Sequence, residues 1–195
     1  MHPIHSRCSG LLATVALLLA SAAPGGGAST NWSDGVTVTF RPELSFPAPV
    51  VTVGDHPVDV ALGDLDTDGD LDIVCANRES NSVSVVIRRD DGSFAPHVEI
   101  PSGAGVSALL LADLDGDGDL DIAAVNFDGD ELAVLMNQGD ASFSGPALYP
   151  TAPDPVHVAA GDLDGDGDLD LVIVHNEWLG RVSVLLNRGD GTFVT

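Results

Sequence analysis

The sequence is poor in cysteine. Its two cysteines are Cys8, in the N-terminal segment, and Cys75, far downstream. Removal of the N-terminal segment would leave a single thiol, so an internal disulfide is excluded in the processed chain. We expect Cys75 to be a buried strand thiol rather than a nucleophile. An exported chain without disulfides needs another cross-link to stabilise its fold, and a bound metal ion is the obvious candidate.

Basic and aromatic residues are also scarce. The chain has 7 Lys and Arg against 30 Asp and Glu, a formal net charge of −23, and only 5% aromatic residues. Nucleic acids and anionic membrane surfaces are bound by clustered basic side chains, so both are excluded as partners. The hydrophobic content of 44% excludes a disordered acidic tail, because apolar runs separate the acidic ones.

After the N-terminal segment, no apolar run in the sequence is long enough to indicate a membrane-spanning helix. Residues 11–20 form a short apolar core that follows the weakly basic His5 and Arg7 and precedes the small residues 20–22. This pattern predicts a signal peptide over residues 1–22, followed by a flexible leader over 23–35. A membrane anchor is the alternative, but it needs about 20 apolar residues. We therefore expect a secreted protein, found extracellularly, at the cell surface or in the periplasm.

What the chain has in excess is aspartate, concentrated in one nine-residue stretch that occurs three times. Its copies begin at residues 64, 113 and 162, which are 49 residues apart. Five carboxylates in nine residues repel one another by a few kcal/mol per contacting pair at an effective dielectric near 20, so a cation is expected among them. The candidate metal ligands are Asp64, Asp66, Asp68, Asp70, Asp72, Asp113, Asp115, Asp117, Asp119, Asp121, Asp162, Asp164, Asp166, Asp168 and Asp170.

The ligand chemistry indicates the metal. Hard carboxylate oxygens without His or Cys favour Ca²⁺ or Mg²⁺ over zinc or copper, and a flexible loop with five acids suits the larger Ca²⁺. We expect the alternating aspartates of each loop to point inward and the leucines at its second and eighth positions to tuck beneath it. An EF-hand is excluded, because its twelfth position must be an acid. The twelfth residues here are Cys75, Ala124 and Ile173.

The repeat predicts an all-β fold. Each period of about 49 residues contains four short strand-like runs and no helical periodicity, which is typical of a four-stranded antiparallel propeller blade. In the second repeat these runs are 106–111, 120–125, 131–136 and 143–149; the fourth run of the first repeat is 94–100. Earlier runs at 36–40 and 46–53 predict more strands.

The predicted units are an N-terminal partial blade at 36–56 and blade repeats at 57–104, 105–154 and 155–195, the last truncated. We expect the array to be incomplete and the chain to be a fragment of a longer protein. The alternatives are chains that associate to complete a ring, or an open array.

The loop pattern Asp-x-Asp-x-Asp-Gly-x-x-Asp between two strands, with a following Asn-x-Gly-Asp-Gly-x-Phe turn, resembles the FG-GAP repeats of the VCBS type. Such repeats occur in secreted bacterial proteins and, more distantly, in the propellers of integrin α chains. The resemblance covers residues 46–195, although the Phe-Gly and Gly-Ala-Pro motifs of the family are incomplete in this sequence, as at 143–146. It implies about three Ca²⁺ sites, one per loop, on the first, third, fifth and ninth Asp and on the carbonyl of the seventh.

These features lead us to expect a structural-calcium scaffold for extracellular binding or adhesion that is not an enzyme. Its partner would be an extracellular protein or glycan, with self-association to complete a propeller as a further expectation. The alternative is an accessory or non-catalytic part of a larger secreted hydrolase or lyase. An enzyme would need a charged cluster, for which His157, His175 and Glu177 are the candidates. The tripeptide at 188–190, Arg-Gly-Asp, is read as one copy of a repeated turn.

Overall fold

The computed structural model describes residues 29–31, 37–39, 50–178 and 180–194, which form strands and turns. The chain divides into two units, Met1–Ala48 and Pro49–Thr195. In the first unit β1 (Ser29–Asn31) pairs antiparallel with β2 (Thr37–Thr39). The predicted signal peptide lies outside the described residues. Within the described ranges, no helix has the length and hydropathy needed to cross a membrane.

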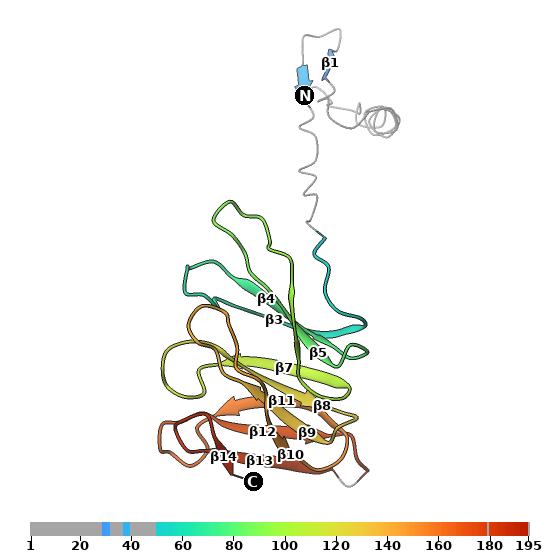
Figure 1. Cartoon of the computed structure of the whole chain (residues 1–195). Coiled ribbons are helices and arrows are strands. Elements are labelled where there is room, and N and C mark those ends of the chain that lie inside the picture. The colour runs from blue at the N-terminus through green and yellow to red at the C-terminus, as the bar shows by residue number, and fades with distance from the viewer. Residues whose placement is uncertain (1–28, 32–36, 40–49, 179, 195) are drawn as a thin grey trace, which may run out of the picture. The chain divides into compact units, whose positions relative to one another are not determined.

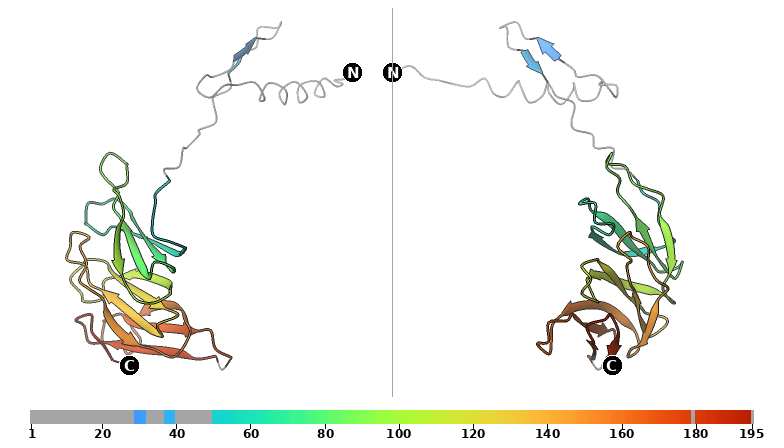
Figure 2. Two further views of the ribbon diagram at one scale, coloured as in Figure 1. Left: turned by 45° about the vertical axis from the view of Figure 1, so that its right-hand side comes forward. Right: turned by 60° about the vertical axis from the view of Figure 1, so that its left-hand side comes forward.

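The second unit is built from three four-stranded antiparallel sheets, each formed by four consecutive strands. We call them blade 1 (β3–β6), blade 2 (β7–β10) and blade 3 (β11–β14). Figure 1 shows them stacked in chain order, and the turned views of Figure 2 agree. The predicted all-β fold with propeller-type blades is confirmed. The strand bounds are β3 Pro57–Gly63, β4 Asp72–Asn77, β5 Ser82–Val86, β6 Val98–Pro101, β7 Val106–Ala112, β8 Asp121–Asn126, β9 Glu131–Leu135, β10 Ala147–Pro150, β11 Pro155–Gly161, β12 Asp170–His175, β13 Val182–Asn187 and β14 Phe193–Val194.

The hydrophobic core lies between the blades. Successive residues of a strand point to opposite faces of the sheet. In β8, Ile122 and Ala124 therefore pack toward blade 1, while Ala123 and Val125 pack toward blade 3. All six residues of β8 are buried, because the middle blade is covered on both faces. This is why its second strand reads as an unbroken apolar run rather than as an alternating one.

The first strands of the blades, β3, β7 and β11, lie next to one another. Each Asp-rich loop joins the first strand of its blade to the second, so the first strand ends at the residue before the loop and the second begins at the ninth residue of the loop. In blade 1 this places Gly63 directly opposite Asp72 in the antiparallel ladder. The sheet thereby holds both ends of the loop at adjacent positions.

The fourth strands begin later than the sequence patterns predict. The runs predicted at 94–100 and 143–149 are strands only at Val98–Pro101 and Ala147–Pro150. Phe94 and Phe143 form isolated bridges instead. Pro96 and Pro146 follow these bridges, and a proline cannot donate a ladder hydrogen bond. The predicted strand at 46–53 is described only from Val50 onward, and no strand is formed over 50–53.

Candidate metal centres

The first aspartate of each loop organises the loop backbone around its carboxylate. In the middle loop, Asp113 accepts hydrogen bonds from the backbone N–H groups of Gly116 (2.8 Å) and Gly118 (3.1 Å). The third loop repeats this with Asp162, and in the first loop Asp64 accepts from residues 68 and 69. An Asp side chain that caps nearby N–H groups in this way closes a tight turn.

The loops require left-handed backbone at two positions. Gly116 and Gly118 have φ values of 77° and 97°, and glycine adopts this region without steric cost. The first loop has Thr67 in place of the first glycine, with a φ of 59°. A β-branched residue in the left-handed region is strained. The backbone of loop 1 is thus more strained than that of the other two loops.

The ninth aspartate is the buried member of each loop. Asp72, Asp121 and Asp170 are 0%, 1% and 1% exposed. In the middle loop, Asp121 Oδ2 accepts from the N–H of Leu114 (2.9 Å) and its Oδ1 from the N–H of Asn137 (2.8 Å). The same two contacts recur in the other blades. Both oxygens are fixed in position, and each retains a lone pair for a further ligand.

The structure brings together the first, third and ninth aspartates of each loop. Their carboxylate oxygens lie within 4.8 Å of one another in three triads, Asp64–Asp66–Asp72, Asp113–Asp115–Asp121 and Asp162–Asp164–Asp170. The arrangement fits a hard cation, because all the converging ligands are carboxylate oxygens. In loop 1, Oδ1 of Asp66 is buried and has no hydrogen-bond partner among the described residues. A cation would supply the missing partner of this oxygen.

Burial also raises the affinity of these groups for positive charge. The pKa of Asp121 is raised to about 6, first by burial and then by Asp115 and Asp117. The pKa values of Asp66 and Asp164 are raised from the ordinary value by burial, with neighbouring carboxylates adding to the shift. Either a proton or a bound cation would relieve this cost.

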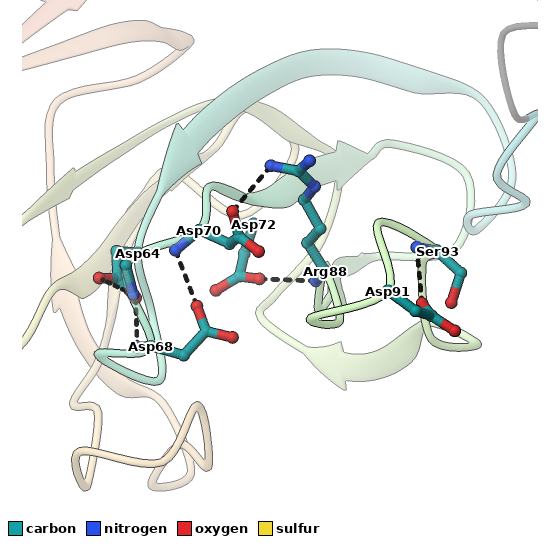
Figure 3. A network of polar contacts seen from close by, with 8 residues as sticks. Asp64, Asp68, Asp70, Asp72, Arg88, Asp91 and Ser93 are labelled. Atoms are coloured by element: carbon teal, nitrogen blue, oxygen red, sulfur yellow. Dashed lines mark hydrogen bonds and ion pairs between the residues drawn. The ribbon is translucent and has the colours of Figure 1, made fainter.

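The fifth and seventh aspartates are not placed in the triads. In the middle loop Asp117 is exposed, and its Oδ1 accepts from the N–H of Asp119 (2.9 Å). The corresponding residues of the other loops make the same contact. Figure 3 shows that Asp70 of loop 1 instead faces Arg88, whose Nη1 lies 2.9 Å from its Oδ1. The assignment of side-chain or carbonyl ligands at these positions stays a prediction.

The predicted burial of all six loop leucines is wrong at two of them. Leu65 and Leu114 are buried at 0% and 2% exposure, but Leu71 and Leu163 are 55% and 54% exposed. The second-position leucines pack against the following blade and the eighth-position leucines against the preceding one. Leu71 and Leu163 are therefore exposed because a neighbouring blade, and not their own loop, provides the cover.

Two asparagines that contact the loops were not predicted from the sequence. Asn137 Nδ2 donates to the Leu65 carbonyl oxygen in the loop of the preceding blade (2.8 Å), and Asn187 Nδ2 donates likewise to Leu114 (2.7 Å). Both asparagines are buried. Arg88 stands at this position in blade 1. The recurrence of Asn-x-Gly-Asp after the third strand was the available signal, but it indicates a turn and not a contact between blades.

Two of the three candidates for an enzyme, His175 and Glu177, are engaged in structural contacts. His175 is buried, with Nδ1 3.0 Å from the Pro153 carbonyl oxygen and Nε2 2.8 Å from Ser183 Oγ. Glu177 pairs with Arg181 at 2.6 Å, and His157 is exposed on β11. These residues are not gathered with a triad.

The tripeptide at 188–190 forms a turn. The Arg188 N–H donates to the Thr192 carbonyl oxygen (3.0 Å), and Asp190 Oδ1 accepts from the Thr192 N–H (3.0 Å).

Cys75 is buried in β4, as predicted, and burial raises the pKa of its thiol.

Several solved structures resemble the chain, among them a lectin and a toxin pore. An Agrocybe aegerita lectin, described as specifically recognising non-reducing terminal N-acetylglucosamine, is 29% identical with a TM-score of 0.49; the match covers 68% of this chain and 36% of the lectin. The Photorhabdus luminescens Tc holotoxin pore is 23% identical with a TM-score of 0.44, covering 89% of this chain and 8% of that one. The chain thus spans about a third of the lectin and under a tenth of the toxin chain. A search of curated proteins finds no match.

A family model matches the chain three times. The model describes an FG-GAP-like repeat and matches residues 64–124, 113–173 and 162–195. The first two matches run from one Asp-rich loop through the second strand of the following blade, and the third starts at the last loop. Together they cover more than half of the sequence and include all three triads. The chain belongs to the FG-GAP-like repeat family.

Proposed function

We propose that the chain is a calcium-stabilised scaffold of propeller blades that works outside the cell as a surface for binding or adhesion. It catalyses no reaction, and its ligand is an extracellular protein or glycan. The observation that carries the proposal is the triad geometry: three carboxylates converge within 4.8 Å in each of three loops, and one of the three is buried. Such a cluster costs stability unless a cation compensates it.

Calcium supplies charge neutralisation and a cross-link at each loop. Asp113, Asp115 and Asp121 would hold it in the middle loop, where the first directly follows β7 and the last begins β8. The cation would thus join the two strands at the edge of the blade. Family membership supports this role, because the repeats that the sequence resembles carry calcium in the same loop.

An extracellular location supports the choice of metal. Extracellular modules bind Ca²⁺ with dissociation constants of about 10⁻⁴–10⁻³ M. At ten times the dissociation constant each site adds about 1.4 kcal/mol to the free energy of unfolding, so three sites add about 4 kcal/mol. This is a large share of a total stability of roughly 5–15 kcal/mol. The signal-like N-terminus supports the same location.

Thermal unfolding in EDTA and in Ca²⁺ tests the metal. We expect EDTA to lower Tm clearly, Ca²⁺ to restore it, and calorimetric titration to count three sites, one per triad. Asp115→Asn should remove one of them. Asp140→Asn is the matched control, because Asp140 lies in an exposed turn and accepts only from Ser142. An identical melting curve with and without EDTA would contradict the proposal.

Arrays of glycans and extracellular proteins, probed in Ca²⁺ and in EDTA, test the binding role. Calcium-dependent retention of a ligand without its conversion supports the scaffold. Turnover of a bound polysaccharide by the purified chain would instead favour the enzymatic alternative.

A further inference from the structure

We propose that the three calcium sites are thermodynamically coupled, so that a cation bound in one Asp-rich loop raises the affinity of the next loop. The buried side-chain amides of Asn137 and Asn187 carry the coupling as positioning residues. This inference rests on the proposed calcium binding and adds a relation between the sites. Its basis is an unbroken series of hydrogen bonds that connects the ninth aspartates of all three loops.

The series is simplest between the middle and third loops. Asp121 Oδ2 of the middle loop accepts from the Leu114 N–H (2.9 Å), and the Leu114 carbonyl oxygen accepts from Asn187 Nδ2 (2.7 Å). The backbone N–H of the same asparagine donates to Asp170 Oδ1 of the third loop (2.8 Å). Three hydrogen bonds therefore lead from the buried aspartate of one triad to that of the next.

The junction between the first and middle loops repeats the series one blade earlier. Asp72 Oδ2 accepts from the Leu65 N–H (2.9 Å), and the Leu65 carbonyl oxygen accepts from Asn137 Nδ2 (2.8 Å). The Asn137 N–H donates to Asp121 Oδ1 (2.8 Å). Asp121 thus receives the link to the first loop on one oxygen and the link to the third loop on the other.

The residues of the series are fixed by burial. Leu65, Leu114 and the two asparagines are all buried. A buried polar group that loses its hydrogen-bond partner is costly, so these contacts are kept together and not broken one at a time. Each loop is therefore held in one arrangement relative to the blade that follows it.

Blade 1 separates the two tasks of the asparagine. Arg88 stands at this position, and its backbone N–H donates to Asp72 Oδ1 (2.7 Å), as the asparagine N–H groups do in the other blades. Its guanidinium pairs with Asp70 of its own loop (Figure 3). The backbone thus holds the ninth aspartate whatever the side chain is. The amide side chain of Asn137 or Asn187 adds the link to the neighbouring loop.

Ordering of the loops gives the coupling its sign. Converging carboxylates repel one another, and a cation that binds them holds the loop in one arrangement. Once the middle loop is held, the Leu114 carbonyl oxygen fixes Asn187, and Asn187 fixes Asp170. The third loop then loses less conformational entropy when it takes its own cation, which is positive cooperativity.

Repulsion between bound cations acts against this coupling. Each loop carries five aspartates and so stays negative after it has taken one divalent cation. The remaining repulsion acts between largely exposed loops, where salt screens it, whereas the buried hydrogen bonds are not screened. Measurements at about 1 M salt, where the Debye length is about 3 Å, therefore isolate the contribution of the hydrogen bonds.

Calorimetric Ca²⁺ titration of the full chain with defined loops measures the coupling. Asp66→Asn removes the first site from every protein compared. Adding Asp164→Asn leaves the middle site alone, adding Asp115→Asn leaves the third site alone, and adding neither leaves both. Asparagine keeps the side-chain oxygen that accepts from the N–H of Asp117 (3.2 Å) or Asp166 (3.3 Å). The coupling factor is the overall constant of the two-site protein divided by the product of the single-site constants.

We expect a coupling factor of about fivefold or more, as is typical of coupled sites. Asn187→Ala in the same three backgrounds should bring the factor close to one while each loop still binds. Asn137→Ala is the matched control, because it removes an equally buried amide from the other junction and leaves the contact to Leu114 intact. The Leu65 carbonyl oxygen also accepts from the Ala141 N–H (3.2 Å), so that junction keeps a link without its amide.

A purely structural role of Asn187 would lower stability and both single-site constants but leave the coupling factor unchanged. That outcome overturns the proposal. A factor near one with both asparagines in place overturns it as well, and this measurement does not depend on whether Asn187→Ala folds. Circular dichroism checks the fold of every variant. Titrations without any calcium binding would overturn both proposals, whereas independent sites would overturn only this one.

Discussion

The side-chain amide of Asn187 in blade 3 donates a 2.7 Å hydrogen bond to the carbonyl oxygen of Leu114, which lies inside the Asp-rich loop of blade 2. The same amide reaches the Leu169 carbonyl oxygen in its own blade (3.0 Å). One buried side chain thus joins two successive Asp-rich loops. Asn137 does the same for the loops of blades 1 and 2.

Asn187→Ala should lower the free energy of unfolding by about 1–3 kcal/mol, because two buried carbonyl oxygens lose their donor. Urea unfolding measures the change. Gln138→Ala, in the exposed part of the equivalent turn, is the control and should stay within about 0.5 kcal/mol of the wild type. Equal stability of Asn187→Ala and Gln138→Ala would mean that the amide contributes nothing.

Thr67→Gly should stabilise the first loop. Thr67 has a φ of 59°, where its β-branched side chain is strained, and the other two loops have glycine at this position. Relief of about 1–2 kcal/mol of strain exceeds the roughly 0.5–1 kcal/mol that a flexible glycine costs in the unfolded chain. The expected net gain is up to about 1.5 kcal/mol by urea unfolding. Thr192→Gly is the control, since Thr192 is absent from the left-handed residues, and a comparable gain there would contradict the explanation.

Arg88→Gln should strengthen Ca²⁺ binding at loop 1. The Arg88 guanidinium pairs with Asp70 at 2.9 Å and lies at the loop as a competing positive charge. Its removal lowers the electrostatic cost of bringing in a divalent cation, by an amount that corresponds to a severalfold change in affinity near a surface. Calorimetric titration measures the affinity. Arg89→Gln is the matched control, because Arg89 bonds to Ser93 and Phe94 and not to the loop. Weaker binding in Arg88→Gln would show that the arginine orders the loop for calcium.

Calcium binding at the middle loop should weaken as the pH falls below about 6. The pKa of Asp121 is raised to about 6 by burial, so at lower pH a proton must leave before the metal can bind. The affinity should then fall about tenfold per pH unit. Calorimetric titration at several pH values measures this, and an affinity that is flat across pH 6 would contradict it.

The stability of the metal-free protein should change with pH in the opposite direction and fall as the pH rises. Because the folded pKa of Asp121 lies above the ordinary value of 3.8, the folded state holds its proton more firmly than the unfolded state does. This contribution is fully present below pH 3.8 and is lost as the pH rises through about 6. Unfolding in EDTA should therefore become easier over this interval. Asp121→Asn, which cannot titrate, should lose this dependence.

Much of the fold could be predicted from the sequence because the repeat is regular. Four apolar runs per 49 residues specify the blade, and the spacing of the aspartates specifies a loop closed by strands. The sequence could not show those features that depend on contacts between neighbouring blades. Leu71 and Leu163 have nearly the same local sequence as their counterparts, which are partly or fully buried, and only the presence of an adjoining blade decides their exposure.

The candidate site was predictable to a similar degree. The first, third and ninth aspartates converge, whereas the fifth, which the alternating pattern also places inward, is outside the triads and is exposed at Asp117. The role of Asn137 was not predictable, because its contact with Leu65 spans 72 residues of sequence and local patterns carry no information on that scale.

The contacts from Asn137 and Asn187 to the preceding loops also set an order in time. A chain synthesised from its N-terminus must extend 72 residues beyond Leu65 before the amide that holds this carbonyl exists, and 73 beyond Leu114 for the next. The loops of blades 1 and 2 are therefore completed only after the following blade has emerged. An elongating chain would carry one unfinished loop at its growing end, and a ribosome or translocase that pauses there would leave that loop the most open to proteolysis.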